Sequence, residues 1–406
     1  MNARRRAGFQ RPGESRGAAL LMLLLAVVLA FGALLVTSLA GNDHEIARRQ
    51  RTIEALARAK QALVAWAVMQ GDIGADSYRR PGTLPCPDTN FFGSASSGNA
   101  SGSCSSAGGT SLGRLPWKSL GVEALRDAHG ELLWYAVSDN FRRPNDLNNK
   151  AINSDTKGSL LLYAPDGDAL LTPPGEELAA VILAPGPPLP GQDRGALSNA
   201  ASSYLEAFKG KNNASAAGPF VMGPVRDPNG NPAVNDLVVG IGARELIAAI
   251  ELRALKEAQN ALKRHVAETG SLPNPAPGDA PGCLSPVTNV KSVVPCASAA
   301  ATCSGRLPED ALTPYVAPWF SQNGWGRVMI YAIDDAGVGC ATSLNVEGKP
   351  KNHVLITTGV ARKGQTRPSA RLSDYLENPG YADGWPGDSG FFVPGTDSND
   401  QLRSDP

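Results

Sequence analysis

An uncharged apolar segment near the N-terminus constrains this chain more than any other feature. Residues 18–40 contain no Asp, Glu, Lys or Arg, and residues 1–17 before them carry five arginines and one glutamate. As a helix, this segment would extend roughly 34 Å, which is enough to cross the hydrocarbon core of a bilayer. Positive charge before the segment keeps the N-terminus in the cytoplasm, so everything after Ala40 is expected outside.

Three kinds of processing fit this N-terminus. An ordinary signal peptide would be cut after Ser38-Leu39-Ala40, which has the small residues that signal peptidase needs, and a signal anchor would not be cut at all. The third route cuts between Gly17 and Ala18, before the apolar segment. The length of that segment favours this third route, because the apolar region of a signal peptide is normally shorter.

The residues after the apolar segment also favour it, because they continue as a predicted helix. Residues 45–70 contain good helix formers and no proline. Apolar residues recur at helical spacing on one side; they are Ile46, Ile53, Leu56, Leu63 and Ala67. Gly41-Asn42-Asp43 is a weak point in this helix and could instead cap a separate one.

A basic leader ending in Arg16-Gly17, an apolar helix and an amphipathic helix together resemble the type IV filament superfamily. That family includes type IV pilins and the pseudopilins of type II secretion, and residues 16–21 are most similar to its minor, tip-associated members. The resemblance implies cleavage after Gly17 by a prepilin peptidase and N-methylation of Ala18. The family usually has Glu at the fifth mature position, and Met22 there argues against a major pilin.

The rest of the chain contains an internal repeat. Several landmarks recur in the same order, including the helix that opens each copy. They are residues 113–116 and 305–308 (both Gly-Arg-Leu-Pro), 181–183 and 354–356, 191–194 and 364–367, 204–206 and 375–377, and the helices 45–70 and 243–269. We therefore predict a leader (1–17), a membrane helix (18–40) and two head copies, at 41–242 and 243–406.

Each copy is predicted to be α+β, with one helix packed on a small antiparallel sheet, as in a pilin head. Strand candidates are residues 132–137, 160–163 and 179–183 in the first copy, and 328–333, 343–346 and 353–357 in the second. The second copy ends where the first continues into residues 237–239, so it is expected to lack a final strand. Residues 237–239 could complete either sheet.

Residues 125–135 resemble the D-x-W-G-x-x-Y segment of pseudopilins, with Asp127 and Gly130 kept and His129 in place of Trp. The second copy keeps Trp325 and replaces the acid. We interpret both as glycine turns that direct an aromatic strand onto the helix, which is a packing role rather than a chemical one.

The six cysteines all follow the apolar segment, and none forms a CxxC pair or lies at zinc-ligand spacing from a histidine. An even number in an exported chain predicts disulfides. Cys86 is expected to pair with Cys104. The other four, Cys283, Cys296, Cys303 and Cys340, allow three pairings, and the repeat favours Cys283 with Cys303 and Cys296 with Cys340.

Other candidate sites are weaker. Residues 387–390 (Gly-Asp-Ser-Gly) match a serine-protease loop, but no histidine lies in a matching motif, so a surface turn is favoured. Alternating oxygen ligands at Asp227, Asn229 and Asn231, with Asp236 after them, make a calcium candidate, although these are also ordinary turn residues and no Glu closes an EF-hand. The formal net charge is +0, so no bulk field attracts nucleic acid.

These observations predict a non-catalytic minor pilin or pseudopilin subunit without a required cofactor. It would be a single-pass inner-membrane protein with periplasmic heads, whose partners are other subunits, reached through the N-terminal helix, and the prepilin peptidase. The Gly/Ser-rich stretch at 93–112 and the duplicated head also fit an adhesin or ligand-binding protein that the apolar helix merely anchors. A secreted hydrolase rests on residues 387–390 alone.

Overall fold

The computed structural model describes residues 44–71, 80–102, 104, 111–142, 151–195, 199–287, 293–300, 302–334, 344–346, 349–377, 391–392 and 400–404. The chain divides into two compact units, Met1–Arg51 and Thr52–Pro406. Of the first unit, the structure describes residues 44–51, which are helical. The predicted leader and the apolar segment at 18–40 lie outside the described residues. No helix within the described ranges is both long and apolar enough to cross a membrane.

Helix α1 covers residues 44–69, as the sequence predicts. Within the second unit it buries Leu56, Ala59, Leu63 and Ala67, whose spacing of three to four residues places them on one face. Ile53, which the same pattern assigns to that face, is 44% exposed. Within the second unit, the apolar stripe of α1 therefore contacts the core from about residue 55 onward.

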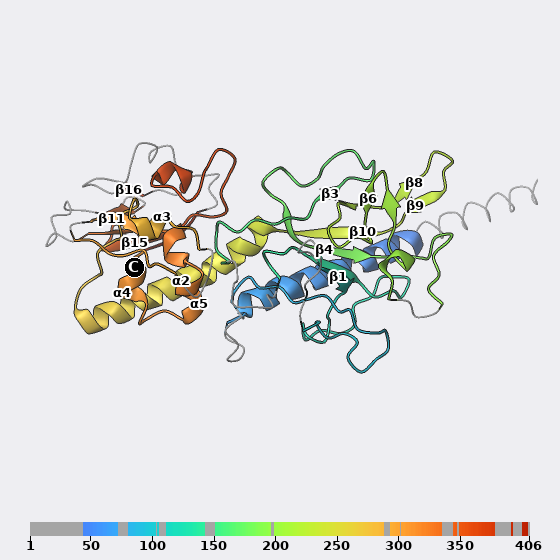
Figure 1. Ribbon diagram of the computed structural model, residues 1–406, viewed down its shortest axis with the longest axis horizontal. Coiled ribbons are helices and arrows are strands. Elements are labelled where there is room, and N and C mark those ends of the chain that lie inside the picture. Colours follow the sequence, from blue (N-terminus) through green and yellow to red (C-terminus); the bar gives the residue numbers. More distant parts are fainter. Residues whose placement is uncertain are drawn as a thin grey trace, which may run out of the picture. The chain divides into compact units, whose positions relative to one another are not determined.

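The first sheet consists of four antiparallel strands in the order β1-β2-β4-β10. They are β1 (Ser111–Arg114), β2 (Trp134–Val137), β4 (Leu178–Ala184) and β10 (Leu237–Gly242), and β4 and β10 lie side by side (Figure 1). Alternate residues of β4 face opposite sides, because side chains alternate along a strand. Ile182 lies in the core shared with the helices, and Val181 lies in a second apolar cluster with Leu160 and Phe220.

Short elements complete the first copy, and those that carry Leu162, Tyr204 and Phe220 pack on the second face of this sheet. They are η1 (Ala201–Ser203), the parallel pair β3 (Leu162–Tyr163) and β7 (Phe220–Val221), the hairpin β5 (Ala207–Phe208) and β6 (Lys211–Asn212), and the hairpin β8 (Val225–Arg226) and β9 (Pro232–Val234). The predicted strand at 160–163 is thus not part of the main sheet. Its C-terminal half pairs with β7, and Leu160 forms only an isolated bridge to Leu178.

Helix α2 (Ala243–Thr269) follows β10 without a loop, and its bounds match the prediction. Its buried residues extend from Ala243 to Leu262, and residues 263–269 at its C-terminal end are not buried. The helix ends at Gly270, whose φ of 83° is the left-handed conformation that glycine adopts without strain.

The second sheet has the same arrangement, with order β11-β12-β15-β17 and antiparallel pairing throughout. Its strands are β11 (Ser304–Arg306), β12 (Met329–Ile333), β15 (His353–Thr357) and β17 (Gln401–Ser404). The expectation that the second copy lacks a final strand is wrong, because β17 occupies the place that β10 has in the first sheet. Residues 237–239 belong to the first sheet, where they pair with β4.

The remaining elements of the second copy are short. They are α3 (Pro281–Leu284), α4 (Glu309–Leu312), α5 (Pro318–Gln322), η2 (Trp325–Val328), η3 (Leu372–Asp374), and the group β13 (Asn345–Val346), β14 (Lys349–Pro350) and β16 (Phe391–Phe392). Of the predicted strand at 343–346, residue 343 lies outside the described residues.

One hydrophobic core joins both copies. Helix α2 contacts β4 and β10 of the first sheet and β15 and β17 of the second. A single buried cluster includes Leu63 and Tyr135 from the first copy together with Trp325 and Tyr331 from the second. Both sheets therefore depend on α2 for part of their burial, and whether either copy folds alone stays a prediction.

Candidate functional site

The same steric requirement explains why both Gly-Arg-Leu-Pro segments begin with glycine. In each copy the arginine of this motif forms an isolated β-bridge with a segment earlier in the sequence. The bridges join Arg114 to Asp88 and Arg306 to Ala276. A Cβ at Gly113 would lie 2.6 Å from the Asp88 carbonyl oxygen, and one at Gly305 would lie 2.0 Å from the Ala276 carbonyl oxygen. Only glycine permits this close approach of two backbones.

The first copy contains a buried arginine that binds several backbone carbonyls. Arg194 donates to the carbonyl oxygens of Gly186 (2.7 Å), Ser203 (3.0 Å) and Tyr204 (3.2 Å) and to Oε1 of Gln192 (2.7 Å). Its guanidinium lies 5.0 Å from the centre of the Tyr204 ring. We call this arrangement the arginine clamp, because one side chain holds the loop after β4 to the loop after η1.

The second copy repeats the clamp atom for atom. Arg367 donates to the carbonyl oxygens of Gly359 (2.7 Å), Asp374 (2.6 Å) and Tyr375 (3.1 Å) and to Oε1 of Gln365 (3.2 Å). Its guanidinium lies 4.6 Å from the centre of the Tyr375 ring. A planar fork of five donors suits this set of acceptors, which a lysine could not satisfy.

The second clamp also reaches into the first copy. Arg367 Nη1 lies 3.6 Å from Oδ1 of Asp155, in the segment before β3. Burial raises the pKa of Asp155, against the opposing effect of Arg367 and Arg306. Next to this pair, Glu251 of α2 is fully buried and accepts a hydrogen bond from the Ser154 hydroxyl. Burial raises the pKa of Glu251 to about 7.

A cavity of about 380 Å³ with both polar and apolar lining residues lies at this junction. Residues of both copies line it, among them Asn153, Asp155 and Lys157 from the first and Arg327, Arg367 and Tyr375 from the second. Its size and its mixture of donors and acceptors suit a small polar ligand.

A second polar cluster lies beside the first clamp. Gln192, which binds Arg194, also donates from Nε2 to Oε1 of Glu206 (2.6 Å). Asp236, which is fully buried, accepts the backbone amide of Glu206 at 3.0 Å, and the two carboxyl groups lie close together. Burial and the neighbouring Glu206 carboxylate raise the pKa of Asp236 well above its ordinary value.

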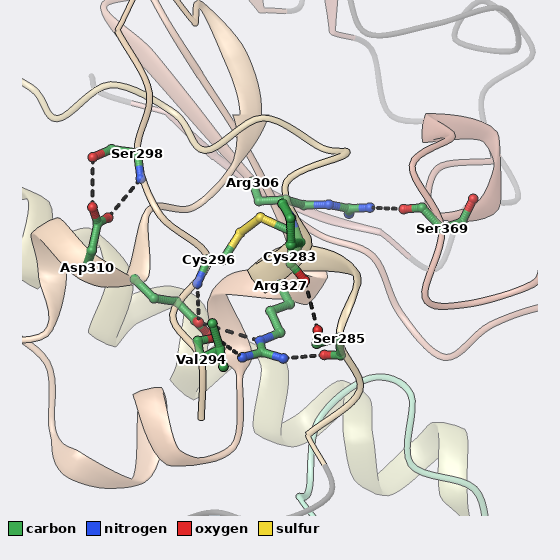
Figure 2. Close-up of a disulfide and its surroundings, with 11 residues drawn as sticks. Cys283, Ser285, Val294, Cys296, Ser298, Arg306, Asp310, Arg327 and Ser369 are labelled. Carbon is green, nitrogen blue, oxygen red and sulfur yellow. Dashed lines mark hydrogen bonds and ion pairs between the residues drawn. A yellow bond between two sulfur atoms is a disulfide. The ribbon is translucent and has the colours of Figure 1, made fainter. Parts of the chain in front are cut away.

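The disulfides agree with the prediction in the first copy and correct it in the second. Cys86 pairs with Cys104, whereas Cys283 pairs with Cys296, not with Cys303 (Figure 2). The reason is local. Cys296 N donates to Oε2 of Glu309, at the start of α4, at 3.0 Å, and Gly282 of α3 lies against the backbone of Pro295 and Cys296. The Cys303 carbonyl instead accepts from Ile333 N at the end of β12.

Cys303 is disulfide-bonded as well, and Cys340 lies outside the described residues. The predicted pairing of Cys296 with Cys340 is excluded, since Cys296 is bonded to Cys283. Disulfides form and persist in oxidising compartments, so these bonds indicate an extracytoplasmic location for the described part of the chain.

Arg327 stabilises the surroundings of this second disulfide. Figure 2 shows its guanidinium donating to the carbonyl oxygens of Ser285 and Val294, on the two sides of the disulfide loop. Arg327 Nε also lies 3.5 Å from Oε2 of Glu309, and both side chains are almost fully buried. The loop is thus held by one covalent bond and one buried ion pair.

The structure does not bring the calcium candidates together. Asp227 accepts the amides of Asn229 and Asn231 and caps the exposed β8–β9 turn. Asp236 instead binds Glu206 N and Asn213 Nδ2. No group of three or more His, Cys, Asp or Glu residues within the described ranges could hold a metal ion. The spacing of Asp227, Asn229 and Asn231 is explained by a turn.

The turn at Asp127 has the packing role that the sequence predicts. The carboxylate accepts the amides of His129 and Glu131, and its other oxygen accepts Gly186 N at 2.8 Å. Ala128 N donates to Thr52 Oγ1 of helix α1 at 3.1 Å. The turn therefore holds the start of β2 against both the helix and the loop after β4.

Three other predicted features, Gly17, Ala18 and residues 387–390, lie outside the described residues. Comparison with protein-family models, with curated proteins and with solved structures found no match. The clamp and the Glu206–Asp236 pair were not predicted as sites. The repeated sequence Gly-Gln-x-Arg followed by Tyr-Leu-Glu was the signal for the clamp and for Glu206, whereas Asp236 lies outside this sequence.

Proposed function

We propose that this protein is a minor pilin-like or pseudopilin-like subunit of a type IV pilus or type II secretion filament. The observation that carries the proposal is the position of helix α1. Only three residues separate the apolar segment at 18–40 from the described start of this helix, whose later turns pack on an antiparallel sheet. A membrane helix continued by a helix that supports a sheet is the organisation that the N-terminal resemblance implies.

In this proposal, residues 18–40 hold the protein in the inner membrane until assembly, with both heads in the periplasm. The disulfides support the placement of the heads, because such bonds need an oxidising compartment. The partners are the membrane segments of other subunits and a prepilin peptidase, and the protein has no catalytic activity. Met22 at the fifth mature position supports a minor rather than a major subunit.

A membrane-anchored binding protein is the second candidate, and the cavity of about 380 Å³ favours it. Both candidates have the same membrane segment but differ in where the mature protein is found. A filament subunit is recovered with sheared filaments or cross-linked to other subunits, whereas an anchored binding protein remains monomeric in the membrane fraction.

The test of the main proposal is processing at Gly17. A prepilin peptidase needs a small residue before the cut, so Gly17→Leu is expected to leave the full-length precursor in the membrane. Gly8→Leu places the same substitution elsewhere in the leader and is expected to mature normally. Normal maturation of Gly17→Leu, read from the mass of the membrane-bound protein, would contradict the proposal.

A further inference from the structure

One carboxyl oxygen of the Glu206–Asp236 pair has no hydrogen-bond donor. Asp236 Oδ2 accepts Glu206 N at 3.0 Å and Asn213 Nδ2 at 2.9 Å. Glu206 accepts Gln192 Nε2 on one oxygen and Asn235 N (3.0 Å) on the other. Oδ1 of Asp236 is buried and receives no hydrogen bond. Two ionised carboxylates in contact inside a protein would repel each other strongly, so one of them is expected to carry a proton.

The charged groups on the surrounding elements are engaged elsewhere. Arg194 binds backbone carbonyls and Gln192, Lys209 pairs with Asp168, and Lys211 lies over the Tyr163 ring. Arg226 and Asp227 bind backbone groups of their own turn, and Asp193 binds the amide of Gly195. Within the described ranges, neither Glu206 nor Asp236 forms an ion pair with a Lys or Arg.

The second copy has an arginine next to the corresponding carboxylate, which the first copy lacks. Glu377 corresponds to Glu206, and it accepts the side chain of Gln365 as Glu206 accepts that of Gln192. There, however, Arg362 Nε lies 3.7 Å from the Glu377 carboxylate. The corresponding residue in the first copy is Leu189, because the amides of Leu189 and Arg362 donate to the equivalent glutamines. The first copy therefore has the carboxylate without its guanidinium.

We propose that Glu206 and Asp236 share one proton, which stays on Oδ1 of Asp236 and is donated to the Glu206 carboxylate. The shared proton takes the place of the arginine and forms an acid-stabilised latch. It joins the residue that precedes β5 to the residue that precedes β10, and so fixes the β5–β9 hairpins to the edge of the first sheet. With the proton in place, every carboxyl oxygen of the pair has a hydrogen-bond partner.

The direction of the pH dependence follows from linkage. The folded chain keeps this proton at pH values where the unfolded chain has lost it, so folding takes up a proton. The latch contributes most below the ordinary pKa of Asp and loses its contribution as the pH rises through the raised pKa of the pair. Alkaline conditions are therefore expected to loosen residues 206–236 before the second sheet.

The experiment measures thermal unfolding of the full chain in detergent at pH 5 and pH 9, for wild type and three variants. Asp236→Asn keeps a neutral donor at this position, and Leu189→Arg introduces the guanidinium of the second copy. Asp227→Asn makes the same chemical change in the neighbouring exposed turn. Between the two pH values, the wild-type midpoint is expected to fall by about 5 °C more than that of Asp236→Asn or Leu189→Arg.

Asp227→Asn is expected to parallel wild type. Equal falls in wild type, Asp236→Asn and Leu189→Arg would overturn the proposal. The same measurement at pH 9 with added CaCl₂ or EDTA provides a second criterion. A wild-type midpoint that calcium raises and EDTA lowers, with no such response in Asp236→Asn, would replace the shared proton with a bound cation and also overturn the proposal.

Discussion

The two four-stranded sheets have the same strand order and the same arginine clamp. They differ in the charged side chains of their loops and in the positions of the disulfides that close those loops. The shared features are those that bind backbone, such as Arg194 and Arg367 on carbonyl oxygens. The differing features depend on side chains alone, such as Arg362 in place of Leu189. Backbone-directed contacts tolerate little change because the fold fixes their acceptors, whereas side-chain pairs can be exchanged one at a time.

The disulfides illustrate the same difference. Residues 86–88 and 274–276 enter the sheets in the same way, since Asp88 and Ala276 form equivalent bridges. The first copy has Cys86 on this segment, and the second has Asn274 there and a cysteine later, at position 283. One disulfide closes the loop in each copy, but its first cysteine lies farther along the loop in the second copy than in the first.

The largest expected effect comes from removing a clamp. Arg367→Ala is expected to lower the free energy of unfolding by about 4 kcal/mol and Arg194→Ala by about 3 kcal/mol, because each leaves buried carbonyls unpaired. Each arginine has one ion pair, Arg194 with Glu131 of its own copy and Arg367 with Asp155 of the first copy. The difference arises because Arg367 also donates to the hydroxyl and carbonyl oxygens of Thr358. Chemical denaturation of the full chain in detergent measures both. A greater loss for Arg194→Ala would contradict the role of Arg367 in joining the copies.

Removing the disulfides is expected to affect the two copies almost equally. The bonds span 18 and 13 residues, so each loop closure contributes about 3 kcal/mol. The double variants Cys86→Ser/Cys104→Ser and Cys283→Ser/Cys296→Ser should therefore show similar unfolding midpoints under non-reducing conditions. Peptide mapping without reduction checks the pairing itself, and recovery of a Cys283–Cys303 peptide would show that the second assignment is wrong.

The smallest of the three effects depends on pH and distinguishes the two helices. Helix α2 buries Glu251, whereas no acidic side chain is buried among the described residues of α1. The pKa of Glu251 is raised to about 7, so its contribution to stability is full below its ordinary pKa and is lost as the pH rises through 7. Relative to Glu251→Gln, wild type should lose about 2 to 3 kcal/mol between pH 4.5 and pH 8. Parallel pH profiles for the two proteins would contradict this.

The sequence predicts the helices and central strands well, because their apolar periodicity is strong and packing confirms it. Residues 45–70 and 243–269 are helical almost to their predicted ends, and 179–183 and 353–357 are central strands. Strand β17 was missed because Gln401–Ser404 contains a single apolar residue, Leu402, and an edge strand needs no more. Its position depends on pairing with β15, which local pattern does not encode.

The candidate sites were harder to predict because side-chain partners come from distant parts of the chain. Glu206 and Asp236 are thirty residues apart, and nothing local distinguishes Asp236 from the turn residues before it. The disulfide in the second copy was predictable in principle. Cys104 and Cys296 both lie nine residues before the glycine of Gly-Arg-Leu-Pro, so counting back from that motif identifies Cys296 as the equivalent cysteine.

The most direct test of the proposed function is the mass of the mature N-terminus. Intact-protein and N-terminal peptide mass spectrometry on protein purified from membranes gives this in one measurement. The proposal predicts a chain that begins at N-methylated Ala18 and retains residues 18–40. A chain that begins at Gly41 would identify an ordinary secreted protein, and one that retains residues 1–17 would identify a simple membrane anchor; either result would contradict a filament subunit.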